Sequence, residues 1–280
     1  MEALDGVAPL ILTVAPNGAR RGKADHPNLP LTASELAREA ALCRDAGAAM
    51  IHIHVRGRDG RHSLDAEAYK SAIAAVRREA GADLLVQITT EAVGVYSPEA
   101  QMMVVGEVAP EAVSIAIREI LPNPALEPTV ARFLAGEAKR GALIQYIVYD
   151  FQDLAAFDAL LDRGVVPGEG ASQLFVLGRY ASGQAGAPTD LPPLLSRRAN
   201  ALPWSVCAFG GREAACAVTA AALGGHARVG FENNLLLPDG AMAPDNAALV
   251  GVVARTAQAI GLAIATPDQA RRLFAGAGVT

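Results

Sequence analysis

Residues 31–55, LTASELAREAALCRDAGAAMIHIHV, contain one copy of each repeating part of the fold. The first part, residues 31–47, is rich in Ala, Leu, Arg and Glu, and Thr32 and Glu35 are placed as a capping box. The second part, residues 50–55, is a short run of β-branched residues and histidines, which predicts a strand. Helices that alternate with strands in this way are typical of α/β proteins.

The same alternation continues along the chain in both directions. Further strands are predicted at residues 10–14, 84–90, 112–117, 142–149, 173–178, 204–209 and 226–231. Further helices are predicted at residues 65–81, 97–108, 128–141, 154–164, 192–201, 212–225, 246–261 and 266–274. Strands separated by helices pair in parallel, and eight such units in about 250 residues predict a closed (β/α)8 TIM barrel. We expect one domain over residues 1–280, with an open doubly wound sheet as the alternative.

Composition and charge exclude several classes of protein. The chain has 280 residues, of which 51% are hydrophobic, so it can bury a full core and is not disordered. Its 24 basic and 29 acidic residues give a net charge of −5, which argues against a nucleic-acid partner. No segment approaches the roughly 20 apolar residues of a membrane span, and the first residues do not have a signal-peptide pattern. Three scattered cysteines without C-x-x-C spacing fit a reducing compartment, so we expect a cytoplasmic protein.

The strongest candidate for a functional site is an H-x-H pair on the second predicted strand. His52 and His54 share one face of this strand, about 6–7 Å apart along it. Glu232 follows the eighth strand, at the end of the barrel where such enzymes carry their chemistry. Two histidines and one carboxylate are a ligand set of catalytic zinc, and they also suit ferrous iron. The alternative is a hydrogen-bonded histidine pair, with Glu232 paired to Arg228 or Arg56.

Several segments resemble the β-keto acid cleavage enzymes nearly from end to end. The resemblance rests on NLP, on H-x-H-x-R and on G-F-E-[DN]-N at their separations in this chain. The segments that carry it are LILTVAPNGA (10–19), ADHPNLPLT (24–32), GAAMIHIHVRGRDGR (47–61), LLVQITT (84–90), QLFVLG (173–178), GGHARVGFENN (224–234) and ATPDQAR (265–271).

The resemblance implies an acyltransferase that converts a β-keto acid and acetyl-CoA into acetoacetate and a new acyl-CoA. It also implies a (β/α)8 barrel, a divalent transition ion such as zinc and a homotetramer. The metal ligands that it implies are His52, His54 and Glu232. Arg228 resembles the family arginine that stabilises developing negative charge near the metal. Thr89 resembles a hydroxyl residue that holds the substrate carboxylate.

One departure from the family pattern concerns the general base. The family often has an aspartate directly after the metal-binding glutamate, and this chain has Asn233 at that position. An amide has no basic carboxylate and cannot accept the proton. Glu91, placed where the family often has glycine, is the candidate substitute, and its alternative role is that of a solvated loop acid.

Other departures concern the end of the substrate that is remote from the reaction. Arg20 stands where the family's aminohexanoate-cleaving type has a glutamate that meets the substrate ammonium. Gln145 and Ile147 take the positions of two inward glutamates, and Arg118 follows the fourth strand where the family has small residues. These changes remove negative charge, so we expect a substrate with an acidic or neutral tail. The alternative for both arginines is a salt bridge within the loops.

Two other functions fit the same barrel. A single-metal hydrolase or lyase that does not use CoA is the main alternative, because Asn233 removes the expected base. A two-metal amidohydrolase is disfavoured, because the fifth and sixth predicted strands contain no histidine. A non-catalytic protein that binds a small acid is the third possibility.

Overall fold

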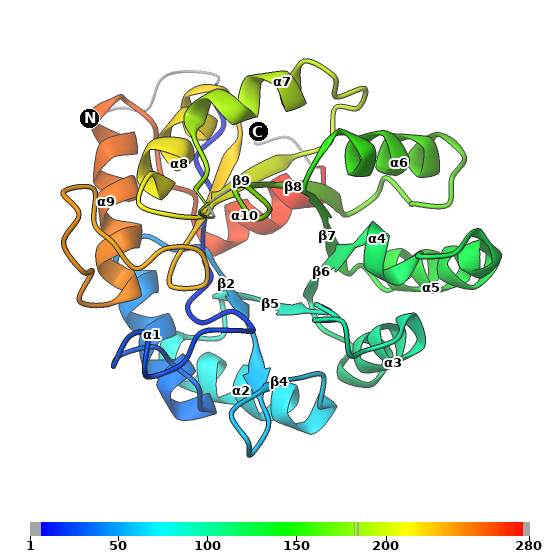
Figure 1. The fold of residues 1–280 in the computed structure, drawn as a ribbon, viewed down its shortest axis with the longest axis horizontal. Helices are drawn as coiled ribbons and strands as arrows, with labels where there is room; N and C mark the ends of the chain where they lie inside the picture. Colours follow the sequence, from blue (N-terminus) through cyan, green and yellow to red (C-terminus); the bar gives the residue numbers. More distant parts are fainter. Residues whose placement is uncertain (1–6, 182, 184, 277–280) are drawn as a thin grey trace.

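The computed structural model describes residues 7–181, 183 and 185–276, which form a closed parallel barrel (Figure 1). The barrel is the fold that the sequence predicts. Its strand order is β1-β10-β9-β8-β7-β6-β5-β2, and β1 closes the ring by pairing with both β2 and β10. The strands are β1 (Leu12–Val14), β2 (Met50–Ile53), β5 (Leu85–Thr89), β6 (Ala112–Ala116), β7 (Leu143–Val148), β8 (Ala171–Leu177), β9 (Trp204–Ala208) and β10 (His226–Val229).

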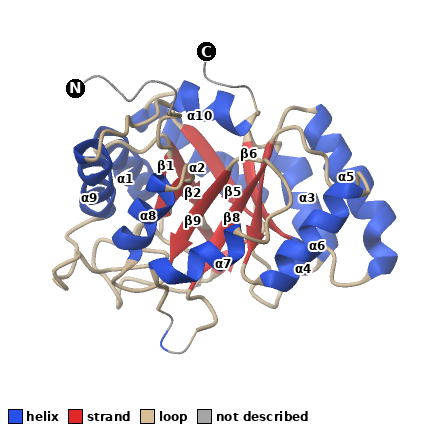
Figure 2. Cartoon of the chain, turned by 90° about the horizontal axis from the view of Figure 1, so that it is seen from above, coloured by secondary structure: helices blue, strands red, loops and turns tan. Residues whose placement is uncertain are grey.

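Helices surround the barrel and cover the outer faces of its strands (Figures 1 and 2). They are α1 (Ala33–Asp45), α2 (Ala66–Ala80), α3 (Pro98–Val108), α4 (Ile117–Ile120), α5 (Glu127–Lys139), α6 (Phe151–Asp162), α7 (Leu191–Leu195), α8 (Glu213–Ala222), α9 (Asn246–Ala259) and α10 (Pro267–Phe274), with the 3-10 turns η1 (Pro124–Leu126) and η3 (Pro188–Asp190). The predicted capping box is present at α1, where Thr32 accepts from the backbone of Glu35. No helix in the described part of the chain has both the length and the apolar run needed to cross a bilayer.

The two ends of the barrel differ in chemistry. At the amino ends of the strands, α10 packs its Phe274 against an apolar layer that includes Ile11, Met50 and Leu85. Figure 2 shows α10 at this end, and the strand arrows point away from it. The apolar layer closes the amino end, which leaves the carboxyl end as the open end.

The chain departs from the predicted pattern at three places. After β2 it forms a hairpin of β3 (Val55–Arg56) and β4 (His62–Ser63), which are paired antiparallel. After β6 it enters the short helix α4, so that the predicted fourth strand ends before Ile117. The helix predicted at 192–201 ends at Leu195, and Arg198 beyond it donates to Gln173 on β8.

Candidate metal centre

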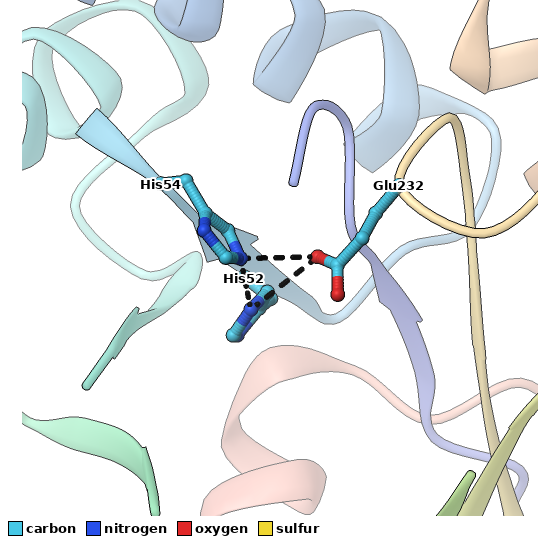
Figure 3. Close-up of side chains that lie close together, drawn as sticks. All are labelled: His52, His54 and Glu232. Carbon is cyan, nitrogen blue, oxygen red and sulfur yellow. Dashed lines mark hydrogen bonds and ion pairs between the residues drawn. The ribbon is translucent and has the colours of Figure 1, made fainter. Parts of the chain in front are cut away.

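Three predicted ligands meet at the carboxyl end of the barrel (Figure 3). The Nε2 atoms of His52 and His54 are 3.0 Å apart. Glu232 Oε2 lies 3.2 Å from His54 Nε2 and 3.5 Å from His52 Nε2. Ligand atoms at about 2.0–2.2 Å from a tetrahedral ion are about 3.3–3.6 Å apart. The triangle, with sides of 3.0–3.5 Å, is slightly tighter than this, so small shifts of the side chains would make room for one zinc-sized ion.

The hydrogen bonds of His52 show which of its ring nitrogens is free. Its Nδ1 is 2.7 Å from Gln87 Oε1, an acceptor, so Nδ1 carries the proton and Nε2 has a free lone pair. Burial lowers the pKa of His52 to about 3, so the ring is neutral at neutral pH. A neutral imidazole with a free Nε2 aimed at a second imidazole and a carboxylate is the form that binds a metal ion.

A chain of polar side chains supports His52 from inside the barrel. Gln87 Nε2 donates to Gln145 Oε1 at 3.4 Å, and Gln145 Nε2 donates to Ser205 Oγ at 3.4 Å. These groups are buried on neighbouring strands, where each amide needs a partner. Gln145, predicted to bind substrate, therefore lies in a layer beneath the metal centre and not among the residues that line the pocket.

The loop after β1 holds the other two ligands in place. Asn17 is fully buried; its Nδ2 donates to the carbonyl of His54 at 2.9 Å, and its Oδ1 accepts from His54 N at 3.3 Å. Gly18 has a φ of 62°, and a Cβ on it would lie 2.6 Å from Glu232 Cγ. A side chain at this position would displace Glu232, so only glycine fits.

Arg228 and Glu232 form a buried ion pair beside the imidazoles. Arg228 Nη2 donates to Glu232 Oε1 at 2.8 Å, which leaves Oε2 directed at the two histidines. Burial by itself raises the pKa of Glu232, but Arg228 and the histidines outweigh it and hold the pKa well below its usual range. Glu232 therefore remains an anion. Its Oε1 makes the ion pair with Arg228 that the sequence left open as an alternative, and its Oε2 stays directed at the histidines, where its predicted role as a metal ligand would need it.

The metal centre opens into a pocket with a volume of about 130 Å³. Four arginines and three glutamates line it, so its charged lining has an excess of one positive charge. They are Arg20, Arg21, Arg179, Arg228, Glu91, Glu119 and Glu232. Thr89 also lines it, at the end of β5, and its Oγ1 accepts from the backbone of Glu91 at 3.0 Å.

Glu91 lies between the metal centre and two arginines. Its Oε2 is 3.9 Å from His54 Nδ1, and its Oε1 is 3.6 Å from Arg20 and 3.8 Å from Arg179. All three distances exceed those of good hydrogen bonds, so the carboxylate is held loosely by charge. His54 Nδ1 has no hydrogen-bond partner in the described part of the chain, which leaves Glu91 as the nearest acid.

The structure does not bring Arg118 and Asn233 to the pocket. Arg118 lies on α4, where it donates to Asp150 at 2.6 Å and to Asp153 at 2.8 Å, the salt-bridge alternative that the sequence left open. Asn233 is fully buried, and neither polar atom of its side chain has a partner among the described residues. Neither side chain is part of the pocket lining, so neither reaches the metal centre directly.

Sequence reasoning missed four charged groups at or near the site. Arg179 follows β8, lines the pocket and lies over the ring of Phe209, 5.1 Å from its centroid. Arg21 donates to the backbone carbonyls of Phe231 and Asn233, and the Oε2 of Glu119 accepts from Ala92 N at 2.9 Å. Glu213 lies outside the pocket and accepts from Gly230 N at 3.0 Å. Arg179 and Glu119 lie two and three residues beyond the ends of β8 and β6, which was a usable signal, but no motif marks any of the four.

The molecule is a (β/α)8 barrel with two histidines and a glutamate gathered at the carboxyl ends of its strands. The particular family follows from sequence comparison. The chain belongs to the beta-keto acid cleavage enzyme family, because the profile of that family matches residues 9–275. This confirms the resemblance and the expectation of an enzyme.

Individual relatives agree with the family. The chain is 33% identical over 271 residues to the 3-keto-5-aminohexanoate cleavage enzyme of Acetoanaerobium sticklandii, which covers 95% of this chain and 97% of the relative. It is 29% identical over 283 residues to the 3-oxoadipate:acetyl-CoA acetyltransferase of Cupriavidus necator, over 95% and 94% of the two chains. ObcA in complex with oxaloacetate has a TM-score of 0.72 at 18% identity, over 90% of this chain and 68% of that chain, which supports the fold alone.

Proposed function

We propose that this protein is a metal-dependent β-keto acid cleavage enzyme. It would convert a β-keto acid and acetyl-CoA into acetoacetate and a new acyl-CoA. The observation that carries the proposal is the triangle of His52, His54 and Glu232, with distances of 3.0–3.5 Å, beside the pocket of a chain in this family. The names of two relatives, a cleavage enzyme and an acetyl-CoA acetyltransferase, support the reaction type.

The donor set suits zinc or another divalent transition ion. His52, His54 and Glu232 would hold it, and all three residues line the pocket. When bound, the ion supplies Lewis-acid polarisation of the substrate's keto oxygen. Gln87 holds the ring of His52 through Nδ1, and Asn17 holds the backbone of His54. Hydrogen-bonded neighbours of this kind orient metal ligands.

Glu91 is our candidate for the general base. It lines the pocket, and its Oε2 is 3.9 Å from the nearest nitrogen of His54. A β-keto acid near the metal centre would present the carbon between its ketone and its carboxylate to this side. The Glu91 carboxylate would take a proton from that carbon and return it as acetoacetate forms, so no net proton is consumed.

Two further groups stabilise the substrate. The hydroxyl oxygen of Thr89 accepts from Glu91 N, so its own O–H is free to donate to the carboxylate of the β-keto acid. Arg228 keeps a fixed positive charge beside Glu232, where negative charge develops on the substrate oxygens. The enolate carbon attacks the acetyl carbonyl and the CoA thiol leaves. That thiol then attacks the original ketone, and a C–C bond breaks to give the two products.

The arginines support an acidic or neutral substrate tail. In the described part of the chain, Arg20 and Arg179 share one carboxylate, Glu91, at 3.6 and 3.8 Å. Neither guanidinium makes a short bond to it, so both keep donors for another anion. A tail carboxylate would complete this arrangement, whereas an ammonium group would be repelled. The Cupriavidus necator relative is named for an acid with a second carboxylate, which agrees with this preference.

The experiment combines the purified, unchelated protein with acetyl-CoA and a panel of β-keto acids that differ in tail charge. New acyl-CoA is measured by mass spectrometry. We expect turnover of acids with acidic or neutral tails and loss of turnover after chelation, with recovery when zinc is restored. The absence of a new thioester from every acid in the panel would overturn the proposal, and so would undiminished turnover by the fully chelated protein.

A further inference from the structure

A second hollow lies beside the metal pocket. Its volume is about 470 Å³, and Ala19 and Arg20 line both spaces. The β3–β4 hairpin forms one side, and residues 93–96 after β5 form the other. The hairpin extends from the barrel beside α2 in Figure 1. The hollow therefore adjoins the space around the candidate metal centre.

The charge of the hollow is opposite to that of the whole protein. Arg20, Arg56 and Arg61 line it with a single carboxylate, Asp59, whereas the chain has a net charge of −5. Arg56 is occupied, because its two Nη atoms donate to the carbonyls of Gly60, Gly18 and Arg21. The side chain of Arg61 is 88% exposed and its ion pair with Asp59 is long, at 3.9 Å, so its guanidinium can still meet a polyanion. Arg20, which pairs with Glu91 at 3.6 Å, adds positive charge where the two spaces adjoin.

The opposite side of the hollow is apolar. Val95 is 77% exposed, and Val93 and Tyr96 lie beside it in the same lining. Tyr96 is fixed by a hydrogen bond from its hydroxyl to the carbonyl of His62 at 3.4 Å. Val93 has a φ of 46°, which is a strained conformation for a β-branched residue. An exposed valine next to a fixed aromatic ring provides a surface for a flat or aliphatic group.

The size of the metal pocket requires a second space for a large co-substrate. Sites that enclose a drug-sized ligand have volumes of about 300–1,000 Å³, and the metal pocket at about 130 Å³ is smaller. An acetyl thioester can enter such a pocket, but the nucleotide of CoA must lie outside it. CoA combines phosphates, a purine and an extended amide-containing arm, which match the arginines and the apolar side of the hollow.

We infer that this hollow binds the phosphorylated nucleotide and pantetheine arm of acetyl-CoA. The phosphates lie near Arg61, and the purine or the arm lies against Val95 and Tyr96. The thioester passes Ala19 into the metal pocket. This inference rests on the proposed use of acetyl-CoA, and the test below separates the two.

The test measures CoA binding by calorimetry in the wild-type protein and in Arg61→Glu, independently of turnover. We expect the charge reversal to weaken CoA binding about tenfold at low ionic strength, and less at high salt. Pantetheine, which lacks phosphates, should bind the two proteins equally. Val95→Asp should also weaken CoA binding, by about threefold to tenfold, because it adds a negative charge to the same hollow. In steady-state assays the KM for acetyl-CoA should rise and the KM for the β-keto acid should stay the same.

The matched control is Arg78→Glu. Arg78 is an exposed arginine in the last turn of α2, and helices of this barrel run opposite to the strands, so it lies towards the amino end. Its reversal makes the same change in net charge and should leave CoA binding unchanged. Equal CoA affinity in Arg61→Glu and wild type, or no CoA binding by the wild type, would overturn the inference. If CoA binds at the hollow and no β-keto acid reacts, the proposed function fails and the inferred site stands.

Discussion

Two parts of the pocket hold their charges in different ways. The metal wall, consisting of His52, His54, Arg228 and Glu232, is almost fully buried, and its ion pair is 2.8 Å long. The arginine wall, consisting of Arg20, Glu91 and Arg179, is more exposed, and its ion pairs are 3.6–3.8 Å long. Barrel strands and their buried partners fix the first group, whereas loops carry the second. If the proposed function is correct, we expect the metal wall to set the reaction and the arginine wall to set the choice of substrate.

The largest effect should come from breaking the metal wall. We expect His54→Ala to lose the bound ion and to lower kcat about a thousandfold or more, because several kcal/mol of charge stabilisation are lost with the ion. Metal content by mass spectrometry and turnover measure the two effects. His226→Gln is the matched control, because His226 lies at the closed end of the barrel, where it accepts from Ile11 N at 3.2 Å and packs against the ring of Phe274. A metal-free His54→Ala protein with near-normal turnover would contradict the role of the metal wall.

The next effect should come from Glu91, where the two walls meet. We expect Glu91→Gln to lower kcat by about a hundredfold to ten-thousandfold while the metal content stays the same, because the amide cannot accept a proton. Single-turnover rates and metal analysis test this. Adding Asn233→Asp to this variant should not restore activity, because residue 233 is buried outside the pocket lining. Restored turnover in the double variant would place the base at residue 233 instead.

A smaller effect should come from the arginine wall alone. We expect Arg179→Met to reduce the preference for an acidic tail over a neutral one by about tenfold to a hundredfold, because a charged hydrogen bond contributes about 1.5–3 kcal/mol. The ratio of kcat/KM for matched substrates with and without a tail carboxylate measures it. Arg118→Met should leave this ratio unchanged, because Arg118 is paired with Asp150 and Asp153. An equal loss of preference in both variants would mean that Arg179 does not bind the tail carboxylate.

The smallest effect on activity should come from Glu213, which supports the loop of Glu232 through Gly230 N. Burial raises the pKa of Glu213 to about 8, from the 4.5 of an unperturbed group. The folded state therefore binds this proton more tightly than the unfolded state does, and stability falls as the pH rises through this range.

Urea unfolding at pH 5 and pH 8 tests this assignment. In Glu213→Gln, which has no charge to bury, the free energy of unfolding relative to wild type should rise by up to about 3 kcal/mol between the two pH values. A difference that does not change with pH would show that Glu213 is ionised throughout.

The sequence predicted the metal wall well because strand geometry determines it. His52 and His54 alternate with buried residues, so one strand places both imidazoles on one face, and Glu232 follows another strand at the same end. The barrel itself follows from the regular order of its strands and helices. Gln145 was placed in the site by the family resemblance, but it lies before the end of β7 and therefore one layer too deep.

The sequence predicted the arginine wall less well because loops determine it. Arg118 was expected to point into the pocket from the end of a strand, but α4 begins at Ile117 and turns the guanidinium towards the first turn of α6. Arg179 was missed because no motif marks the residue after β8. Backbone direction after a strand depends on local contacts that residue spacing does not record.

The closure of the barrel has a consequence for the order in which the site is assembled. The histidines lie on β2 and Glu232 follows β10, and β1 is the strand that joins these two to each other. An incomplete ring lacks one side of the triangle, so the chain can take up an ion at full affinity only after its earliest and latest strands have paired. Once bound, the ion would link β2 to the segment that follows β10. The pairing of β1 with these two strands should therefore break at a higher temperature in the metal-loaded protein than in the chelated one.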